Sequence, residues 1–179
     1  MDFRELHTER LILREINPEV HNYIYSNFTD AQLMAFLGLD TEALAKEKAK
    51  YAVGLVTFNK SYLYHTIIER KSGNIIGWCG YHTWYTQHNR AEIGYGLYSD
   101  DYKRQGIMTE ALNAILAFGF SNMNLHRIEA MTASYNTASI NTLLKFGFTQ
   151  EGILREHYLV GDKMEDSLMF SLLKHEFAL

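Results

Sequence analysis

The spacing of hydrophobic positions changes from helical to extended partway along the chain. Apolar and polar side chains first alternate over residues 10–16, which predicts a strand that ends at Asn17 and Pro18. Apolar positions then recur with the helical period of about 3.6 residues. The helices predicted from this spacing span residues 19–27, 29–38 and 41–58.

Three segments with strand composition follow. They are rich in β-branched and aromatic residues and are separated by short polar loops, a pattern typical of an antiparallel meander. The predicted strands span residues 62–69, 74–85 and 92–98.

The last part of the chain combines helices and strands. An amphipathic helical pattern over 103–122 connects the strand 92–98 to a strand over 126–132, so the connection is too long for a hairpin. Such a crossover places its two strands side by side and parallel. The remaining predicted elements are a helix over 136–145 closed by Gly147, and strands over 148–160 and 163–173.

These elements predict a mixed α/β fold with a single domain over residues 1–179. We expect a mixed, mostly antiparallel sheet of about six to seven strands, flanked by about four helices.

The helix of the crossover begins without a residue that could cap it. The first four N–H groups of a helix lack intrahelical partners, and Ser, Thr, Asp or Asn usually binds one of them. Here the chain has Lys103, Arg104, Gln105 and Gly106. Free N–H groups, the positive end of the helix dipole and two cationic side chains together favour an anion. We therefore expect a phosphate-bearing ligand, such as a pyrophosphate, at this helix start.

Composition limits the class of protein. Hydrophobic residues make up 47% of the chain and charged residues 21%, which predicts a folded globular protein. The net charge of −4 gives no electrostatic reason to bind nucleic acid, and we expect none. No apolar run approaches the roughly 18 residues of a membrane span, so we expect no membrane association.

Cysteine and histidine usage narrows the chemistry. The single cysteine, Cys79, excludes an internal disulfide and suits a reducing compartment, so we expect a cytoplasmic protein. Its apolar surroundings favour a packing role over that of a reactive nucleophile. The 8 histidines show no spacing typical of metal ligands, and we expect no metal.

Five segments, in order along the chain, carry a resemblance to one family. They are residues 8–14, 91–95, 103–111, 136–148 and 151–162. With these segments the chain resembles the GNAT superfamily of acetyl-CoA-dependent N-acetyltransferases, and most closely the branch that contains the bacterial ribosomal-protein N-terminal acetyltransferases. The resemblance implies a GNAT fold and acetyl-CoA as cosubstrate.

The phosphate-binding segment of that family reads Gln or Arg, any two residues, Gly, any residue, then Gly or Ala. This chain keeps the central Gly106 but has Lys103 in the first place and Met108 in the last. The resemblance implies that backbone N–H groups of 105–108 hold the pyrophosphate, and that the strand 92–98 splays from its neighbour to expose backbone groups to pantetheine. The implied cosubstrate contacts are Leu97, Tyr98, Lys103, Arg104, Gln105, Gly106, Ile107, Met108, Thr109 and Asn136.

Glu92 is the carboxylate best placed by sequence to act as a general base through a water molecule. The alternative is a structural ion pair with Arg90 or Arg127, or a solvated side chain.

The proton for the departing thiolate needs another source. Many GNAT enzymes use a tyrosine at the position that is Leu143 here. Asn136 and Ser139 instead match the Asn, any two residues, Ser pattern of the ribosomal-protein branch, in which the serine faces the thioester sulfur. The alternative for Ser139 is a local hydrogen bond to the backbone at the helix start. Asn136 is expected to act both as N-cap and as a pantetheine contact.

Two features of the strands allow more than one interpretation. Gly94 and Gly96 permit close approach of a ligand or a bulge, or they pack beneath a helix. The aromatic residues Tyr81, His82, Trp84 and Tyr85 line an acceptor pocket, or they pack in the core or a dimer interface.

The resemblance favours direct transfer to a protein N-terminal α-amine in a ternary complex. An α-amine has a pKa of about 7.7 to 8.0, so more of it is neutral near pH 7 than of lysine, at about 10.4. One alternative is a small amine such as a polyamine, amino sugar or amino acid, and another is a non-catalytic acyl-CoA-binding protein. Both a monomer and a homodimer fit the sequence.

Overall fold

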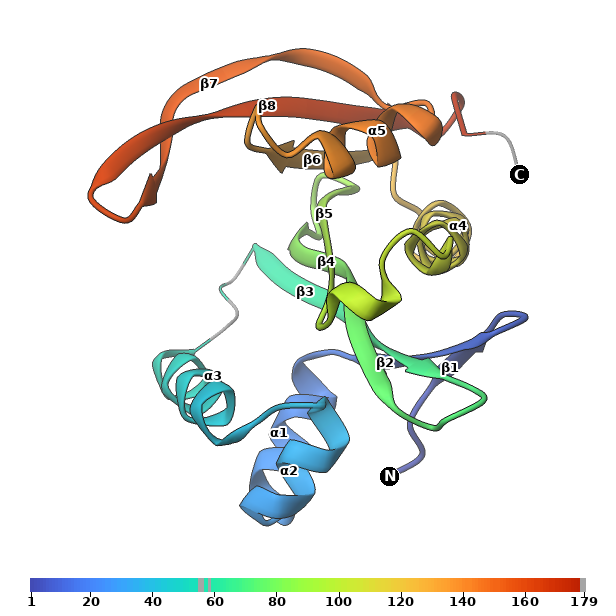
Figure 1. Ribbon diagram of the computed structural model, residues 1–179, viewed down its shortest axis with the longest axis vertical. Helices are drawn as coiled ribbons and strands as arrows, with labels where there is room; N and C mark the ends of the chain where they lie inside the picture. Colours follow the sequence, from blue (N-terminus) through green and yellow to red (C-terminus); the bar gives the residue numbers. More distant parts are fainter. Residues whose placement is uncertain (55–56, 58, 178–179) are drawn as a thin grey trace.

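The computed structural model describes residues 1–54, 57 and 59–177 (Figure 1). In chain order, its elements are β1 (Glu5–His7), β2 (Leu11–Ile16), α1 (Pro18–Asn27), α2 (Asp30–Leu37), α3 (Thr41–Val53), β3 (Lys60–Glu69), β4 (Ile75–Tyr85), β5 (Arg90–Leu97), the 3₁₀ helix η1 (Asp100–Tyr102), α4 (Ile107–Ser121), β6 (Arg127–Thr132), α5 (Thr137–Lys145), β7 (Thr149–Val160) and β8 (Lys163–Leu173).

The strands form one sheet in the order β1-β2-β3-β4-β5-β6-β8-β7. Only β5 and β6 are parallel among its neighbouring pairs, and α4 forms the crossover between them. The predicted parallel crossover and antiparallel meander are therefore confirmed. No helix in the described part of the chain is long and apolar enough to cross a membrane.

Helices cover both faces of the sheet (Figure 1). On one face, the Tyr81 hydroxyl of β4 donates a hydrogen bond to the Ile115 carbonyl of α4, at 2.8 Å. On the other face, His21 of α1 lies within hydrogen-bond distance of Tyr62 and Tyr64 of β3. The larger buried cluster lies between the sheet and α4, and a smaller one joins α1–α3 to the opposite face.

Three details differ from the prediction for local reasons. The described chain has eight strands because β1 pairs with β2, although its three residues are too few to show an alternation. α3 ends at Val53 because Gly54, with φ of +93°, closes it. Residues 55, 56 and 58 of the predicted helix lie outside the described residues. α4 begins at Ile107 rather than Lys103, because Gly106 has φ of +73° and turns the chain into the helix.

Candidate active site

β5 and β6 separate after a short parallel contact. Within the described residues, 90–92 of β5 pair with 127–129 of β6, and the pairing ends there. Both strands continue beyond this point, to Leu97 and Thr132. A cleft of about 370 Å³ lies where they part, with walls from β4, β5, β6, α5 and the β7–β8 hairpin. The splayed strands that the resemblance implies are present, and the cleft connects the two faces of the sheet.

Alternation along β5 sends its side chains to opposite faces of the sheet. Ile93 belongs to the cluster under α4, and Tyr95 packs against it. Glu92 and Gly94 face the side of α1–α3, where a Cβ on Gly94 would meet His82 at 2.6 Å and Trp78 at 2.8 Å. A residue without a side chain is therefore needed at position 94 because His82 and Trp78 of β4 lie over it. The close neighbours of Gly94 are these side chains and not a helix.

Among the residues that the structure describes, the Glu92 carboxylate has no lysine or arginine partner. Its side chain is 13% exposed, and its nearest basic group is His82, whose Nε2 lies 3.5 Å from Oε1. Burial lowers the pKa of His82, which favours the neutral imidazole. Burial, and then the charge of Glu129, raise the pKa of Glu92 above its ordinary value. A carboxylate in this state is a stronger base than an ordinary one.

Among the described residues, Glu92 forms no ion pair with Arg90 or Arg127. Arg90 donates to Glu129 at 2.7 Å, and Arg127 donates to the same carboxylate at 2.7 Å. Arg127 also forms a two-bond contact with Glu151 of β7. The arginines next to the cleft are therefore engaged by other carboxylates.

Two hydroxyl groups meet across the cleft from Glu92. Ser139 Oγ of α5 lies 2.9 Å from the hydroxyl of Tyr95 on β5. Asn136 accepts a hydrogen bond from the Ser139 N–H at 3.2 Å, so its predicted role as N-cap is confirmed. Leu143, at the usual tyrosine position, is 2% exposed and lies in the core.

Tyr95 was not singled out from the sequence as a site residue. The only signal was its place on the strand, three positions after Glu92 and so on the opposite face. Its contact with Ser139 joins residues from β5 and α5, which the sequence alone does not bring together.

Two further carboxylates of the cleft were also missed. Glu165 accepts a hydrogen bond from the Tyr135 hydroxyl at 2.8 Å, and Asp166 accepts one from the Glu156 N–H at 2.8 Å. Both lie on β8, a segment whose sequence pattern predicts a strand and nothing more.

The start of α4 has the geometry expected of an anion site. Gly106 provides no side-chain cap, and the Glu110 N–H donates to the Gly106 carbonyl at 3.0 Å. The N–H groups of Ile107, Met108 and Thr109 precede this bond and lack intrahelical acceptors. Lys103, which pairs with Asp100, and Arg104 are exposed beside them.

A contact between distant segments holds this turn in place. Glu110 accepts hydrogen bonds from Thr8 Oγ1 at 2.5 Å and from the N–H and Nε of Arg10 at 2.7 and 2.6 Å. Arg10 Nη1 also donates to the Gln105 carbonyl at 3.0 Å. Sequence reasoning missed this role, although Thr8 and Arg10 lie in a segment that carries the family resemblance.

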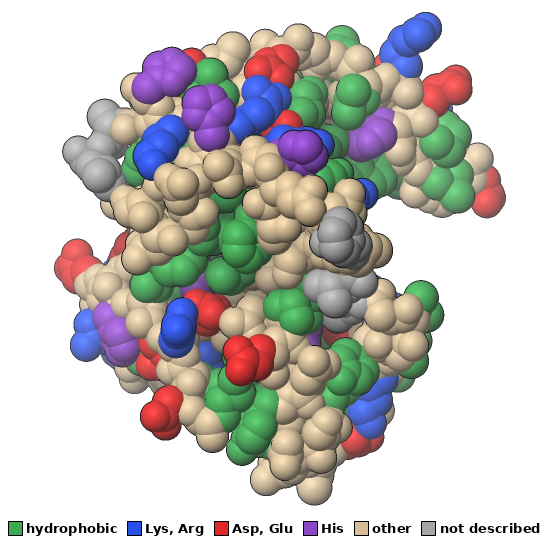
Figure 2. Space-filling view, turned by 180° about the vertical axis from the view of Figure 1, so that it is seen from behind, with side chains coloured by type: hydrophobic (Ala, Val, Ile, Leu, Met, Phe, Trp, Pro, Cys, Tyr) green, Lys and Arg blue, Asp and Glu red, His purple; other side chains and the backbone are tan. Residues whose placement is uncertain are grey.

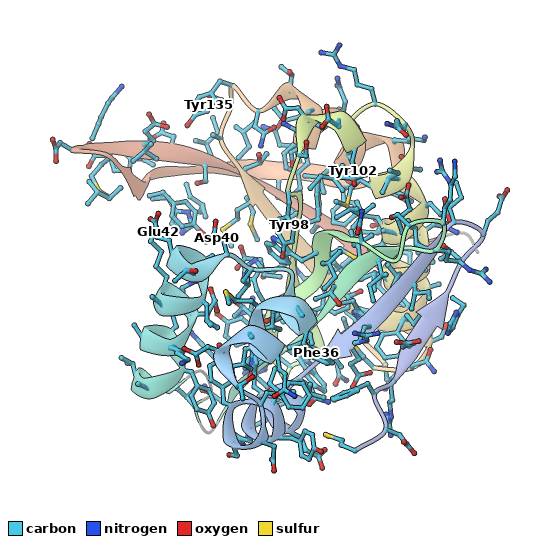
Figure 3. The ribbon with its side chains drawn as sticks, turned by 60° about the horizontal axis from the view of Figure 1, so that its bottom comes forward. Phe36, Asp40, Glu42, Tyr98, Tyr102 and Tyr135 are labelled. Carbon is cyan, nitrogen blue, oxygen red and sulfur yellow. The ribbon has the colours of Figure 1, made fainter. Side chains whose placement is uncertain are left out.

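At the end of β5, the backbone groups of Leu97 and Tyr98 differ in whether β4 engages them. The Tyr98 N–H donates to the Ile76 carbonyl of β4 at 2.9 Å, so it is not free. Because backbone groups alternate in direction along a strand, those of Leu97 point to the open side of β5. The Tyr98 ring is 47% exposed at the end of β5, beside α2 and α3 (Figure 3).

Most of the other candidate residues lie outside the cleft. Cys79 is fully buried, and burial raises the pKa of its thiol, which argues against a nucleophile. Tyr81 is in the core, and the Tyr85 ring stacks on the Arg90 guanidinium at 3.8 Å. His82 is the one residue of the four aromatic candidates that lines the cleft. The described residues contain no group of three or more His, Cys, Asp and Glu arranged to hold a metal ion.

Comparisons with known proteins identify the family. The family model described as "Acetyltransferase (GNAT) domain" matches residues 10–149. The uncharacterized N-acetyltransferase YoaA of Bacillus subtilis (strain 168) is 32% identical over 178 residues, which cover 96% of this chain and 98% of the relative.

Two further matches carry names that mention an acceptor. Spermidine N(1)-acetyltransferase of Escherichia coli (strain K12) is 24% identical over 90 residues, 50% of this chain and 48% of the relative. The crystal structure of ribosomal-protein-S5-alanine acetyltransferase from Vibrio fischeri has a TM-score of 0.66 at 21% identity, and covers 98% of this chain and 100% of that one. This likeness shows a shared fold, with its mixed sheet and flanking helices. The chain belongs to the GNAT family of N-acetyltransferases, which use acetyl-CoA.

Proposed function

We propose that the chain, as a single domain over residues 1–179, transfers the acetyl group of acetyl-CoA directly to a protein N-terminal α-amine within a ternary complex. One observation carries the proposal: Glu92 and the Tyr95–Ser139 pair line one cleft from opposite faces of the sheet. A base on one side and proton donors on the other are what acetyl transfer from a thioester to an amine requires.

The acyl donor fits the α4 side of the cleft. The unbonded N–H groups of residues 107–109, the helix dipole and the exposed Lys103 and Arg104 suit the pyrophosphate. Gln105 and Asn136 border the path from this turn to the cleft in the proposed arrangement. The open backbone side of Leu97 faces the pantetheine, in the manner of a strand that pairs with the ligand.

The side chains then divide the chemistry. Acetyl-CoA supplies an activated acetyl group with a thiolate as leaving group. Glu92 accepts the proton of the attacking amine through a water molecule, helped by its raised pKa. Ser139 hydrogen-bonds the sulfur and passes its hydroxyl proton to the departing thiolate, while Tyr95 donates its own proton to Ser139 across their 2.9 Å contact and regains one from water.

A surface feature supports a polypeptide acceptor. Seen from behind, the molecule is notched between the β7–β8 hairpin and the part that carries α3 (Figure 2). The hairpin exposes several large apolar side chains, a surface that suits contact with a protein. They are Ile153, Leu154, Tyr158, Leu159, Val160 and Met164.

An acceptor panel tests this function. Peptides with a free N-terminus, the same peptides with a blocked N-terminus and an internal lysine, and small amines are each incubated with acetyl-CoA, and the products are located by mass spectrometry. We expect saturable acetylation of the free α-amine. Turnover on small amines with none on any peptide would overturn the protein acceptor.

A second candidate is a small-molecule amine acetyltransferase. A separate cavity of about 380 Å³ adjoins the cleft on the α1–α3 face, large enough for a small amine. The name of the Escherichia coli relative, a spermidine acetyltransferase, agrees with this reading. The same panel separates the two candidates.

A further inference from the structure

The cavity on the α1–α3 face opens toward the proposed base. Trp78 and His82 line both this cavity and the cleft, so the two spaces share a wall. Glu92 lies on the same face of the sheet as these two side chains. A molecule in the cavity can therefore present one end to Glu92.

Aromatic rings form most of the cavity wall. They come from α1, β3, β4 and the end of β5, and belong to His21, Tyr62, Tyr64, Trp78, His82 and Tyr98. Burial lowers the pKa of His21 to about 4, so its imidazole is neutral. Its two ring nitrogens lie 2.5 Å from the Tyr62 hydroxyl and 3.2 Å from that of Tyr64. The wall is thus uncharged and rich in π faces, which attract organic cations.

The cavity has one source of negative charge. Glu47 of α3 is the only carboxylate among the described residues that line it. Lys50 also lines the cavity, and its Nζ lies 2.5 Å from this carboxylate, but the Lys50 side chain is 62% exposed and that of Glu47 29%. An exposed pair of this kind contributes little, so the lysine can turn into water when another cation arrives.

A buried hydroxyl also lacks a partner in the cavity. Thr66 of β3 is 1% exposed, and its Oγ1 finds no hydrogen-bond partner in the described part of the chain. Buried polar groups are normally bonded, and Thr66 belongs to the cavity wall, so a polar ligand group that reaches its oxygen would satisfy it. A hydrocarbon side chain in the cavity would leave it unpartnered, whereas an ammonium group offers it a donor.

The geometry points to a binding site for a second, protonated amino group of the acceptor, held by the aromatic wall, Glu47 and Thr66 while the acetylated amine reaches Glu92. The inference rests on the proposed function and specifies its acceptor as a primary amine with an ammonium group several bonds away. Two sources share this chemistry: a polyamine, and a peptide that begins with lysine.

Matched acceptors test the site. Putrescine is compared with pentylamine, in which a methyl group replaces the second ammonium, and a peptide that begins with lysine is compared with one that begins with norleucine. We expect kcat/KM to be at least about tenfold higher for the dication of one pair, and that pair identifies the source. Glu47→Gln should reduce this ratio severalfold, and Thr66→Val should reduce it by a smaller factor, because the aromatic wall still attracts the ammonium in both variants.

Glu42→Gln is the matched control, because Glu42 lies in the first turn of the same helix (Figure 3) and pairs with Lys46 outside the cavity. It should leave the ratio unchanged. Equal kcat/KM within both pairs, or an unchanged ratio in Glu47→Gln, would overturn the inference.

Calorimetry of putrescine and pentylamine with the enzyme–CoA complex provides a readout that does not need turnover. Selective binding of putrescine without acetylation of any amine would contradict the proposed function but not the site. Acetylation without selectivity for the second charge would contradict the site alone.

Discussion

The Glu92 side chain is 13% exposed, and among the described residues only the neutral imidazole of His82 lies within ion-pair distance of its carboxylate. The sequence predicted Glu92 as the candidate base from its place on the strand. The Glu92 carboxylate is left unpaired by the arginines because Arg90 and Arg127 both donate to Glu129, which no local pattern reveals. Arg90 and Arg127 could each have paired with Glu92 by spacing. The parallel register places all four residues together, and geometry then assigns both arginines to Glu129.

Replacing Glu92 with Gln should lower kcat by about 100-fold or more, the usual range for a general base. Because a base must be ionised, wild-type activity should rise with pH through a pKa above the ordinary 4.5, and the variant should lack this limb. Initial rates across pH measure both effects. Glu165→Gln tests the other candidate base in the cleft. A large fall in kcat for Glu165→Gln, together with an unchanged kcat for Glu92→Gln, would assign the role of base to Glu165.

The hydroxyl pair makes a separate prediction. Tyr95→Phe and Ser139→Ala should each lower kcat by about three- to tenfold, since one hydrogen bond contributes about 0.5–1.5 kcal/mol. The double variant should lose little more than either single variant, because the two groups act in series. Single-turnover rates of the two single variants and the double variant test whether the two hydroxyl groups act in series. Additive losses, or a fall in stability with kcat unchanged, would limit the pair to packing.

At the scale of elements, the start of α4 depends on the first strands of the sheet. Glu110, in the first turn of α4, binds Thr8 and Arg10, and Arg10 reaches the carbonyl of Gln105. Burial acts to raise the pKa of Glu110, but the bonds from Thr8 and Arg10 together hold it below its ordinary value. The anion-binding turn is therefore fixed by a contact outside its own segment.

Glu110→Gln should raise the KM for acetyl-CoA severalfold and lower the free energy of unfolding by about 1–3 kcal/mol, because charge-assisted bonds to Arg10 are lost. Since the folded-state pKa is lowered, the stabilisation is present above about pH 4.5 and lost as pH falls below it. Urea unfolding and cosubstrate kinetics measure the two effects. Glu42→Gln, an exposed carboxylate, should show neither; an unchanged KM in Glu110→Gln would contradict the bracing role.

The elements were predictable where the pattern was long and local. The period of the crossover helix and its missing cap predicted both the parallel pair and the open α4 start. β1 was missed because three residues carry no measurable period, and the end of α3 depended on the conformation of Gly54. The Arg10–Glu110 contact joins residues far apart in sequence, which pattern reasoning does not pair.

At the scale of the whole molecule, the core beneath α4 contains a polar exception. His65 of β3 is fully buried beside the Phe118 ring, and neither ring nitrogen has a partner in the described residues. Burial lowers its pKa to about 4. Above pH 6.5 the imidazole is neutral in both the folded and the unfolded chain. Below it, only the unfolded chain binds the proton, until about pH 4.

His65→Leu should therefore flatten the loss of stability between pH 6.5 and about 4. It should also raise the free energy of unfolding near pH 7 by about 1 kcal/mol, because two unbonded polar atoms leave the core. Part of the pH dependence of the free energy of unfolding should remain, since the pKa of His21 is also lowered to about 4. Denaturant unfolding near pH 7 and near pH 5 measures the free energy of unfolding and its change with pH. A change with pH equal to that of the wild type would contradict the account of His65.

Proton and acyl transfer in one ternary complex is the central claim, and a single-turnover experiment tests it most directly. The enzyme is mixed with acetyl-CoA, an α-amine peptide is added later, and free CoA thiol and acetylated peptide are followed together in the wild type and in Glu92→Gln. We predict that both products appear in equal amounts only after the peptide is added, and far more slowly in the variant. Release of CoA before the peptide, or binding of acetyl-CoA with no transfer to any amine, would contradict the account.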